Sequence, residues 1–266
     1  MKATSKRPRL KDRRRTALLI RVLLVVVLVF AIVGGLIYAA HRPELSITTV
    51  QVAGTSAAKN DDIRAVVESD ISGSYAYIIP RNTELTLPRA SIRENLLATF
   101  PDLKTVTLSV SNVRILVVTI AGRSSVAEWC GKEPYTGNAD CYDMDENGFL
   151  FYKSEQAQVR RYTGPLEGEP LGATFLRGDF ARLNDLVDHI AQVLDGHIRS
   201  IHVAANRDVF ADVAGIGELR FVKSTDPTDL LTNIKSVFDS AQFKSEGVLE
   251  YADFRFGGKA LLKFKK

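Results

Sequence analysis

The chain has 266 residues, of which 45% are hydrophobic and 25% are charged, an ordinary balance for one large folded domain or two modest ones. Its net charge of +4 is unevenly placed. Residues 1–16 carry eight basic side chains against one acidic, Arg21 and Arg42 add two positive charges, and residues 43–266 therefore sum to about −5. Because the larger part is mildly acidic, nucleic-acid binding by the body of the protein is disfavoured.

An apolar segment follows the basic residues. Nineteen consecutive residues, Val22 to Ala40, lack a charge, and as a helix they match a bilayer core of about 30 Å. A cleaved signal peptide is the alternative, but it would have a shorter apolar core and a small residue at the −3 position. We therefore predict a basic cytoplasmic tail over 1–16 and an uncleaved transmembrane helix over 17–40, with the rest of the chain outside the cytoplasm.

The next segment, residues 44–122, predicts a small α+β layer. Alternating side chains indicate strands, and apolar residues at helical spacing indicate helices. The predicted elements are a strand over 47–53 ended by Gly54, helices over 60–69 and 88–100, and strands over 103–110 and 114–122. Residues between the helices read as a polar connector. This order packs two helices on one face of a three-stranded sheet.

Residues 123–266 predict a second, antiparallel-rich β region with two amphipathic helices. Its first part, 123–163, reads as all-β. One helix is expected within 179–197, and a second begins where Asp226 precedes Pro227. Three strands separate the helices, and two more surround Gly257-Gly258, a strong hairpin signal.

The two cysteines lie within the first part of this region. Cys130 and Cys141 are in an oxidising compartment if the topology is right. A disulfide that closes so short a loop would contribute roughly 3 kcal/mol, and two free thiols are the alternative. No histidine is near in the sequence, so a zinc site lacks ligands.

The run "DMDENG", residues 143–148, matches the first half of a calcium-binding EF-hand loop. A working loop needs a bidentate Glu at position 12 and helices on both sides. Position 12 is Ser154, and the flanking residues are strand-like. We interpret the run as a hairpin turn over 145–148, in which Asn147-Gly148 is the favoured two-residue connection.

Signals for catalysis are weak. The four histidines are scattered, and His189 and His197 are eight residues apart in the same predicted helix, too far to chelate together. The glycines at 215 and 217 lack the third glycine of a dinucleotide loop and read as a turn, and Trp129 reads as a core residue. We expect no enzyme activity, no cofactor, no metal and no small-molecule substrate.

Several segments together resemble the FtsQ/DivIB family of bacterial cell-division proteins. The matches are "ITTVQVAG" with "NDDIRAVV", "LPRASIRENLLATFPDLKTVTLSV", "RILVVTIAGRSSVAEW" and "YADFRFGGKALLKF". The resemblance implies a POTRA domain over 44–122 and an FtsQ-type extracytoplasmic β-domain over 123–266. It also implies a bitopic scaffold in the inner membrane at the division septum, which recruits FtsB/FtsL-type partners. The septal synthase complex is a further partner that the resemblance implies.

In that family the partners bind largely through the last strands of the β-domain, by adding a strand to its edge. Carried over residue by residue, the expected partner-binding residues are Tyr251, Phe256, Gly258, Lys259, Leu261, Lys263 and Phe264. The simpler interpretation is that the lysines only protect an edge strand from aggregation. The alternatives for function are a membrane-anchored POTRA protein of polypeptide transport and an extracytoplasmic adhesion or sensor module.

Overall fold

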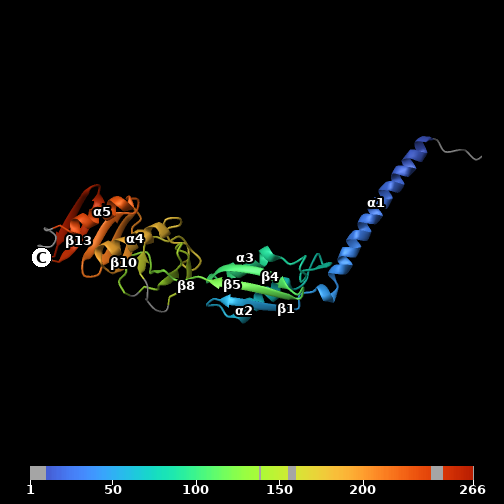
Figure 1. The fold of residues 1–266 in the computed structure, drawn as a ribbon, viewed down its shortest axis with the longest axis horizontal. Helices are drawn as coiled ribbons and strands as arrows, with labels where there is room; N and C mark the ends of the chain where they lie inside the picture. The colour runs from blue at the N-terminus through green and yellow to red at the C-terminus, as the bar shows by residue number, and fades with distance from the viewer. Residues whose placement is uncertain (1–9, 138, 155–159, 241–247, 266) are drawn as a thin grey trace, which may run out of the picture. The chain divides into compact units, whose positions relative to one another are not determined.

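The computed structural model describes residues 10–137, 139–154, 160–240 and 248–265 (Figure 1). The chain forms two compact units: the first contains Met1–Ala98 and Thr105–Ala121, and the second contains Thr99–Lys104 and Gly122–Lys266. Both mix helices with strands, which confirms the α+β prediction.

The helix α1, Leu10–Ala40, contains the predicted apolar segment. Its window Leu18–Gly35 is long and apolar enough to cross a membrane, and none of that window is buried within the protein. A helix of this kind serves as a membrane anchor or as a signal sequence. It begins at Leu10, so the second part of the predicted tail over 1–16 is helical, and residues 1–9 lie outside the described residues.

A three-stranded sheet in the order β1-β5-β4 forms the centre of the first unit. Its strands are β1 Thr49–Thr55, β4 Leu103–Ser111 and β5 Ile115–Gly122, and its helices are α2 Asn60–Ile71 and α3 Arg89–Thr99. β1 and β5 are parallel. The helices bury Ile63 and Ile92 completely, as does the central strand with Val118. Alternating and helical apolar patterns therefore meet in one core, as the sequence predicts.

Two details of the first unit differ from the prediction. Gly54 does not end β1, because the strand continues through Thr55 and Gly54 pairs with Ile120. A Cβ at Gly54 would lie 1.9 Å from the Ile120 carbonyl oxygen, and its φ is +115°. This glycine therefore permits close approach of two backbones instead of terminating the strand.

The second difference lies between α2 and α3. The predicted polar connector contains a small hairpin, β2 Ser74–Tyr75 and β3 Ile79–Pro80. Its turn residues Ala76 and Tyr77 have positive φ, a conformation that sequence patterns assign to Gly or Asn. The hairpin was therefore not recognisable from its residues.

The second unit contains a nine-stranded sheet in the order β14-β13-β12-β11-β10-β9-β6-β7-β8. The strands are β6 Ala127–Trp129, β7 Tyr142–Met144, β8 Leu150–Lys153, β9 Arg161–Thr163, β10 Ile198–Val203, β11 Asp208–Val213, β12 Gly217–Val222, β13 Leu249–Phe256 and β14 Lys259–Phe264. Five neighbouring pairs are antiparallel, and three, β6–β9, β9–β10 and β12–β13, are parallel.

The two amphipathic helices connect parallel strands. α4, Phe180–Leu194, joins β9 to β10, and α5, Pro227–Phe238, joins β12 to β13. Right-handed crossovers that proceed in the same direction place both helices on one face of the sheet, and α4 and α5 are in contact there (Figure 1). Asp226 caps α5 as predicted, accepting from the backbone N–H of Thr228 at 2.9 Å.

α4 ends sooner than the sequence suggests. Its cap residue, Asp195, adopts the left-handed conformation with φ 46°, so the chain leaves the helix before His197. His189 and His197 therefore do not share a helix. The helices cover a core in which Tyr162, Phe180 and Phe221 are almost completely buried.

We predict that Gly54→Ala disrupts the first unit by about 3 kcal/mol, because the new Cβ clashes with the backbone of Ile120 and the φ is unfavourable. Gly73→Ala is the matched control, since Gly73 also has positive φ but no atom within 4 Å of its Cβ position; it should cost about 1 kcal/mol. Hydrogen exchange of the β5 amides in the detergent-solubilised chain reports the difference. Equal losses in the two variants would contradict the close approach.

Candidate functional site: the β14 edge of the large sheet

The two edges of the nine-stranded sheet differ in whether another segment of the chain bonds to their backbone. At the β8 edge the segment Gly172–Phe175 lies alongside and bonds to the exposed backbone. The Leu150 N–H donates to the Ala173 carbonyl at 2.9 Å, and the Gly172 N–H donates to the Leu150 carbonyl at 2.8 Å. Within β8 these bonds involve only Leu150, its first residue, so the segment covers the start of this edge.

At the other edge, no strand lies beyond β14 among the described residues. The Lys265 N–H donates to the Val248 carbonyl at 2.8 Å, toward the neighbouring chain segment. Backbone groups alternate along an antiparallel strand, so the N–H and C=O of Ala260 and Leu262 point away from β13. Such groups are a template for an added strand.

The side chains of β14 alternate as predicted. Ala260, Leu262 and Phe264 pack against the core, whereas Lys259, Leu261 and Lys263 are exposed. Leu261 is 55% exposed. The edge thus presents one apolar side chain between two lysines. Phe264, one of the expected partner-binding residues, is partly buried and packs against the core.

The hairpin tip adds further exposed surface to this edge. β13 and β14 are joined through Gly257 and Gly258, and Gly258 has φ +70°. Phe256 precedes the turn and is 52% exposed. A pocket of about 580 Å³ lies beside the tip, between α5 and the end of β13, and is lined by Phe254, Asn233 and both glycines.

Tyr251 and Lys263 already have partners within the chain. The Arg220 guanidinium carbon lies 3.8 Å from the centre of the Tyr251 ring, and Lys263 Nζ lies 5.6 Å from it. Lys263 also donates to Glu250 at 2.8 Å, which raises its pKa. Among the described residues Lys259 forms no ion pair, so it is the more available cation. Arg220 and Glu250 were not predicted, since only the β12–β13 pairing brings Arg220 to Tyr251.

A charged network holds the end of β13 beneath the tip. Arg255 donates to the nearly buried Asp253 at 2.9 and 2.6 Å and also to Asp208 on β11. These hydrogen bonds from Arg255 lower the pKa of Asp253. β13 bulges in this stretch, where Asp253 pairs with Leu261 but Phe256 pairs with Lys259. The network therefore fixes the bulge from which Phe256 projects.

The EF-hand-like run folds around a buried ion pair. Asp145 is completely buried, and Arg123 donates to one of its carboxylate oxygens. The other oxygen accepts from the backbone N–H of Asn147 at 2.8 Å and of Phe149 at 3.1 Å. Asp143 bonds instead to Ser125 at 3.0 Å. The carboxylates thus serve separate internal partners.

The turn itself differs in type from the prediction. Gly148 donates its N–H to the Asp145 carbonyl, so Glu146 and Asn147 are the central residues and Gly148 follows with φ +77°. This is a three-residue hairpin loop with a left-handed glycine, not a two-residue Asn-Gly turn. Gly148 is required because a Cβ would lie 2.5 Å from the Phe175 carbonyl oxygen.

Cys130 and Cys141 are joined in a disulfide, which ties the end of β6 to the start of β7. Glu128 lies close to both sulfurs, and these three residues are the one group of possible metal ligands among the described residues. The bonded sulfurs are not thiolates, so the group offers one carboxylate. Trp129 is buried in the core, where its Nε1–H donates to the Gly164 carbonyl at 3.2 Å.

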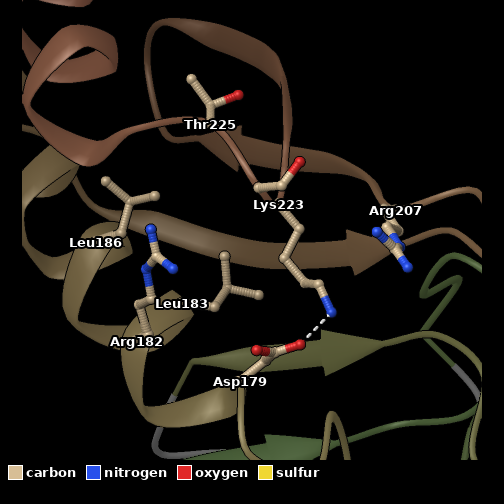
Figure 2. Close-up of a pocket in the computed structure, with 8 residues that line it drawn as sticks. Asp179, Arg182, Leu183, Leu186, Arg207, Lys223 and Thr225 are labelled. Atoms are coloured by element: carbon tan, nitrogen blue, oxygen red, sulfur yellow. Dashed lines mark hydrogen bonds and ion pairs between the residues drawn. The ribbon is translucent and has the colours of Figure 1, made fainter.

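A smaller pocket, of about 250 Å³, lies between the start of α4 and the end of β12 (Figure 2). Lys223 crosses it to contact Asp179 at 2.5 Å, which lowers the pKa of that carboxyl. Arg182 and Arg207 add positive charge to its rim. The described lining also includes Ser224 and Thr225, and its one carboxylate, Asp179, is paired with Lys223.

The histidines are separate in the structure as well. His189 donates from Nδ1 to the Asp185 carbonyl of its own helix, and His41 donates from Nδ1 to the Ile37 carbonyl near the end of α1. His202 bonds to Thr163 at 2.9 Å. Partial burial lowers the pKa of His202. These contacts are structural, and they bring no two histidines together.

Comparison with known proteins adds no family assignment. No protein-family model matches the chain, and no curated protein matches it. The β14 edge is nevertheless distinct from the other features, since it combines outward backbone groups, the exposed Phe256 and Leu261, and the available cation Lys259. It is therefore the candidate binding site.

We predict that Asp145→Asn lowers the free energy of unfolding by about 3 kcal/mol, because it leaves Arg123 without its buried partner. Asp143→Asn is the matched control and should cost less than about 1 kcal/mol, since burial already raises the pKa of Asp143. Calcium should change neither value. Urea unfolding of the parent chain and of both variants, followed by fluorescence of Trp129, the only tryptophan, measures these free energies with and without calcium. Calcium stabilisation lost in both variants would support the EF-hand interpretation.

A pH dependence follows from Asp253. Its pKa is lowered from 3.8 in the folded chain, so its charge stabilises the fold above that pH, and this contribution disappears as the pH falls through the lowered value. Asp253→Asn should lower the free energy of unfolding by about 2 kcal/mol at pH 7. The difference in this free energy between the variant and the parent chain should narrow below about pH 4. The exposed Glu169→Gln is the control, with no gap expected. A gap that widens in acid would contradict the assignment.

Proposed function

We propose that the protein is a membrane-anchored scaffold of the FtsQ/DivIB type, which recruits FtsB/FtsL-type partners to septal cell-wall synthesis in bacteria. The observation that carries this proposal is the contrast between the two sheet edges. The chain covers the start of β8 with its own segment, whereas no described segment pairs with the outer side of β14. A partner strand would pair with the outward groups of Ala260 and Leu262.

The side chains of β14 suggest the chemistry of such a partner. Leu261 and Phe256 are exposed apolar groups, and Lys259 is a cation without an ion pair among the described residues. An added strand with alternate apolar side chains and a carboxylate opposite Lys259 would complement this edge. Lys263 contributes less, because Glu250 already balances its charge. An edge that only resisted aggregation would not need an exposed Leu261 between its lysines, nor an exposed Phe256 at the end of the neighbouring β13.

Other parts of the chain support the same class of protein. The first unit has the element order that the resemblance implies for a POTRA domain, with an added small hairpin. α1 is long enough to be the single membrane span, and the basic residues before it favour a cytoplasmic N-terminus. The second unit would then lie outside the cytoplasm, where a disulfide is stable.

We predict that Ala260→Pro abolishes capture of the FtsB-like partner by the full chain, because it removes an N–H that points to the added strand. The ladder to β13 does not use that N–H. Ala260→Ser keeps the N–H and should bind normally. Pull-down from detergent-solubilised membranes measures capture, and Trp129 fluorescence checks folding.

Cell experiments test the wider role. A fluorescent fusion of the chain should band at midcell, and a chain without residues 259–266 should fail to capture the partner. Even staining of the whole membrane would count against a role in division. Full capture by both Ala260→Pro and the shortened chain would exclude strand addition at β14 and favour a different surface.

A further inference from the structure

The exposed apolar side chains of the first unit gather in three short stretches. Outside α1, the large apolar residues of this unit that are strongly exposed are Leu45, Tyr75, Tyr77, Ile78, Leu85 and Val113. Tyr77 is 98% exposed and Leu85 is 92% exposed. Isolated exposed apolar residues need no explanation, but a set confined to a few loops indicates a contact surface.

These stretches lie at one end of the three-stranded sheet. Ser46 forms a β-bridge with Thr83, and the Ile47 N–H donates to the Asn82 carbonyl at 2.7 Å. The Thr48 N–H donates to the Arg114 carbonyl at 2.9 Å, which places the β4–β5 turn beside the start of β1. The segment after α1, the loop over 73–86 and the turn over 112–114 therefore meet where the chain enters the sheet.

The chain itself keeps this end close to α1. Ser46 is only the sixth residue after Ala40, the last residue of α1, and six residues span at most about 20 Å. Part of this connection is the short helix Pro43–Leu45, which shortens it further. If Val22 to Ala40 cross the bilayer core, the segment over 41–46 begins in the headgroup layer.

The chemistry of these loops suits a membrane interface. Tyrosine and arginine are typical of the headgroup layer, where the ring is partly buried and the charge meets phosphate. Arg81 lies 4.8 Å from the centre of the Tyr75 ring, and Arg42 lies 5.1 Å from the Tyr38 ring at the end of α1. Two tyrosine–arginine pairs thus stand on either side of the same short connection.

The turn of the β2–β3 hairpin also exposes its aromatic residue, Tyr77. Ala76 and Tyr77 have φ of 49° and 62°, and the Ile78 N–H donates to the Tyr75 carbonyl at 3.0 Å. This is the conformation that Asn-Gly adopts most readily, and it costs other residues about 1 kcal/mol each. The tip therefore holds a tyrosine in an unfavourable conformation, and packing within the described residues does not account for it, since Tyr77 is almost fully exposed.

We propose that the hairpin over 74–80 and Leu85 insert into the outer headgroup layer of the bilayer that α1 spans, so that the first unit rests on the lipid surface. This inference depends on the membrane anchor of the proposed function. Other occupants of the surface, a partner protein or a second copy of the chain, would shield the same residues by protein contact, not by lipid.

Spin labels on the full chain in phospholipid nanodiscs test the inference. The only two cysteines are joined in the disulfide, so a single introduced cysteine takes the label. The probe position is Tyr77→Cys, and Lys59→Cys, an exposed residue beyond the opposite end of β1, is the matched control. Collisions with oxygen, which concentrates in lipid, and with a water-soluble nickel chelate are measured. At 77 we expect nickel collisions several-fold below those at 59, with oxygen collisions increased.

A third label, at Val27→Cys within α1, separates the two proposals. A lipid signal at 27 with a water signal at 77 would overturn the lipid contact and leave the anchor intact. A water signal at 27 would overturn the anchor, and the lipid contact with it. Protection of 77 from both oxygen and nickel would mean protein contact, and it too would overturn the inference.

A stabilised turn separates membrane contact from folding. Ala76→Asn combined with Tyr77→Gly supplies the favoured turn residues, so the hairpin should become more stable. With a label at Leu85→Cys, the same change should increase nickel collisions at that position, because the tyrosine anchor is gone. Unchanged collisions at 85, with a lipid signal retained, would show that Tyr77 does not hold the loop at the membrane.

Discussion

An open β-sheet has two edge strands, each with backbone N–H and C=O groups that no neighbouring strand pairs. Whether the chain itself pairs these groups determines what the second unit can bind. At the start of β8 the chain returns, and Gly172–Phe175 forms backbone hydrogen bonds with Gly148 and Leu150. At β14 the described residues supply no such cover. Unpaired backbone groups are costly when buried and adhesive when exposed. The proposed binding site is therefore a consequence of topology, and the side chains of the edge determine which partner fits it.

The same topology makes the edge firm. The crossover helices α4 and α5 cover one face of the sheet, and the partly buried Ala260, Leu262 and Phe264 of β14 pack against the core. Arg255 braces the end of β13 through Asp253 and Asp208. Packing and ion pairs thus fix the inner side of β14, so the backbone N–H and C=O groups of Ala260 and Leu262 keep pointing outward. A fixed edge loses little conformational entropy when a partner strand pairs with it.

Sequence patterns predict the individual helices and strands well, but they predict poorly which strands pair in the sheet. Alternation identifies β14, including which side chains face the core, and the Asp226-Pro227 pair correctly marks the start of α5. Such signals are local. The strand order is not local, because α4 and α5 return the chain to a parallel neighbour and bring Arg220 over Tyr251. No spacing in the sequence indicates that contact.

The errors have specific physical causes. Gly54 after an alternating run predicts a strand end, but a glycine also permits the close approach of two strands. The hairpin over 74–80 was missed, because Ala76 and Tyr77 occupy a turn conformation that rarely suits them. The acidic run near 145 resembled a calcium loop because Asp, Asn and Gly favour turns in both settings. Ser154 at position 12 and the strand-like flanking residues already favour the turn, whereas the type of turn and the buried ion pair of Asp145 with Arg123 are visible only in the fold.

The most direct test of strand addition is residue-resolved hydrogen exchange along β14, with and without the FtsB-like partner. In the free chain the outward amides of Ala260 and Leu262 should exchange quickly, whereas the inward amides of Leu261 and Lys263 should be protected by β13. Partner binding should slow exchange at 260 and 262 specifically. If the partner binds while those two amides continue to exchange as in the free chain, the β14 edge is not the binding site.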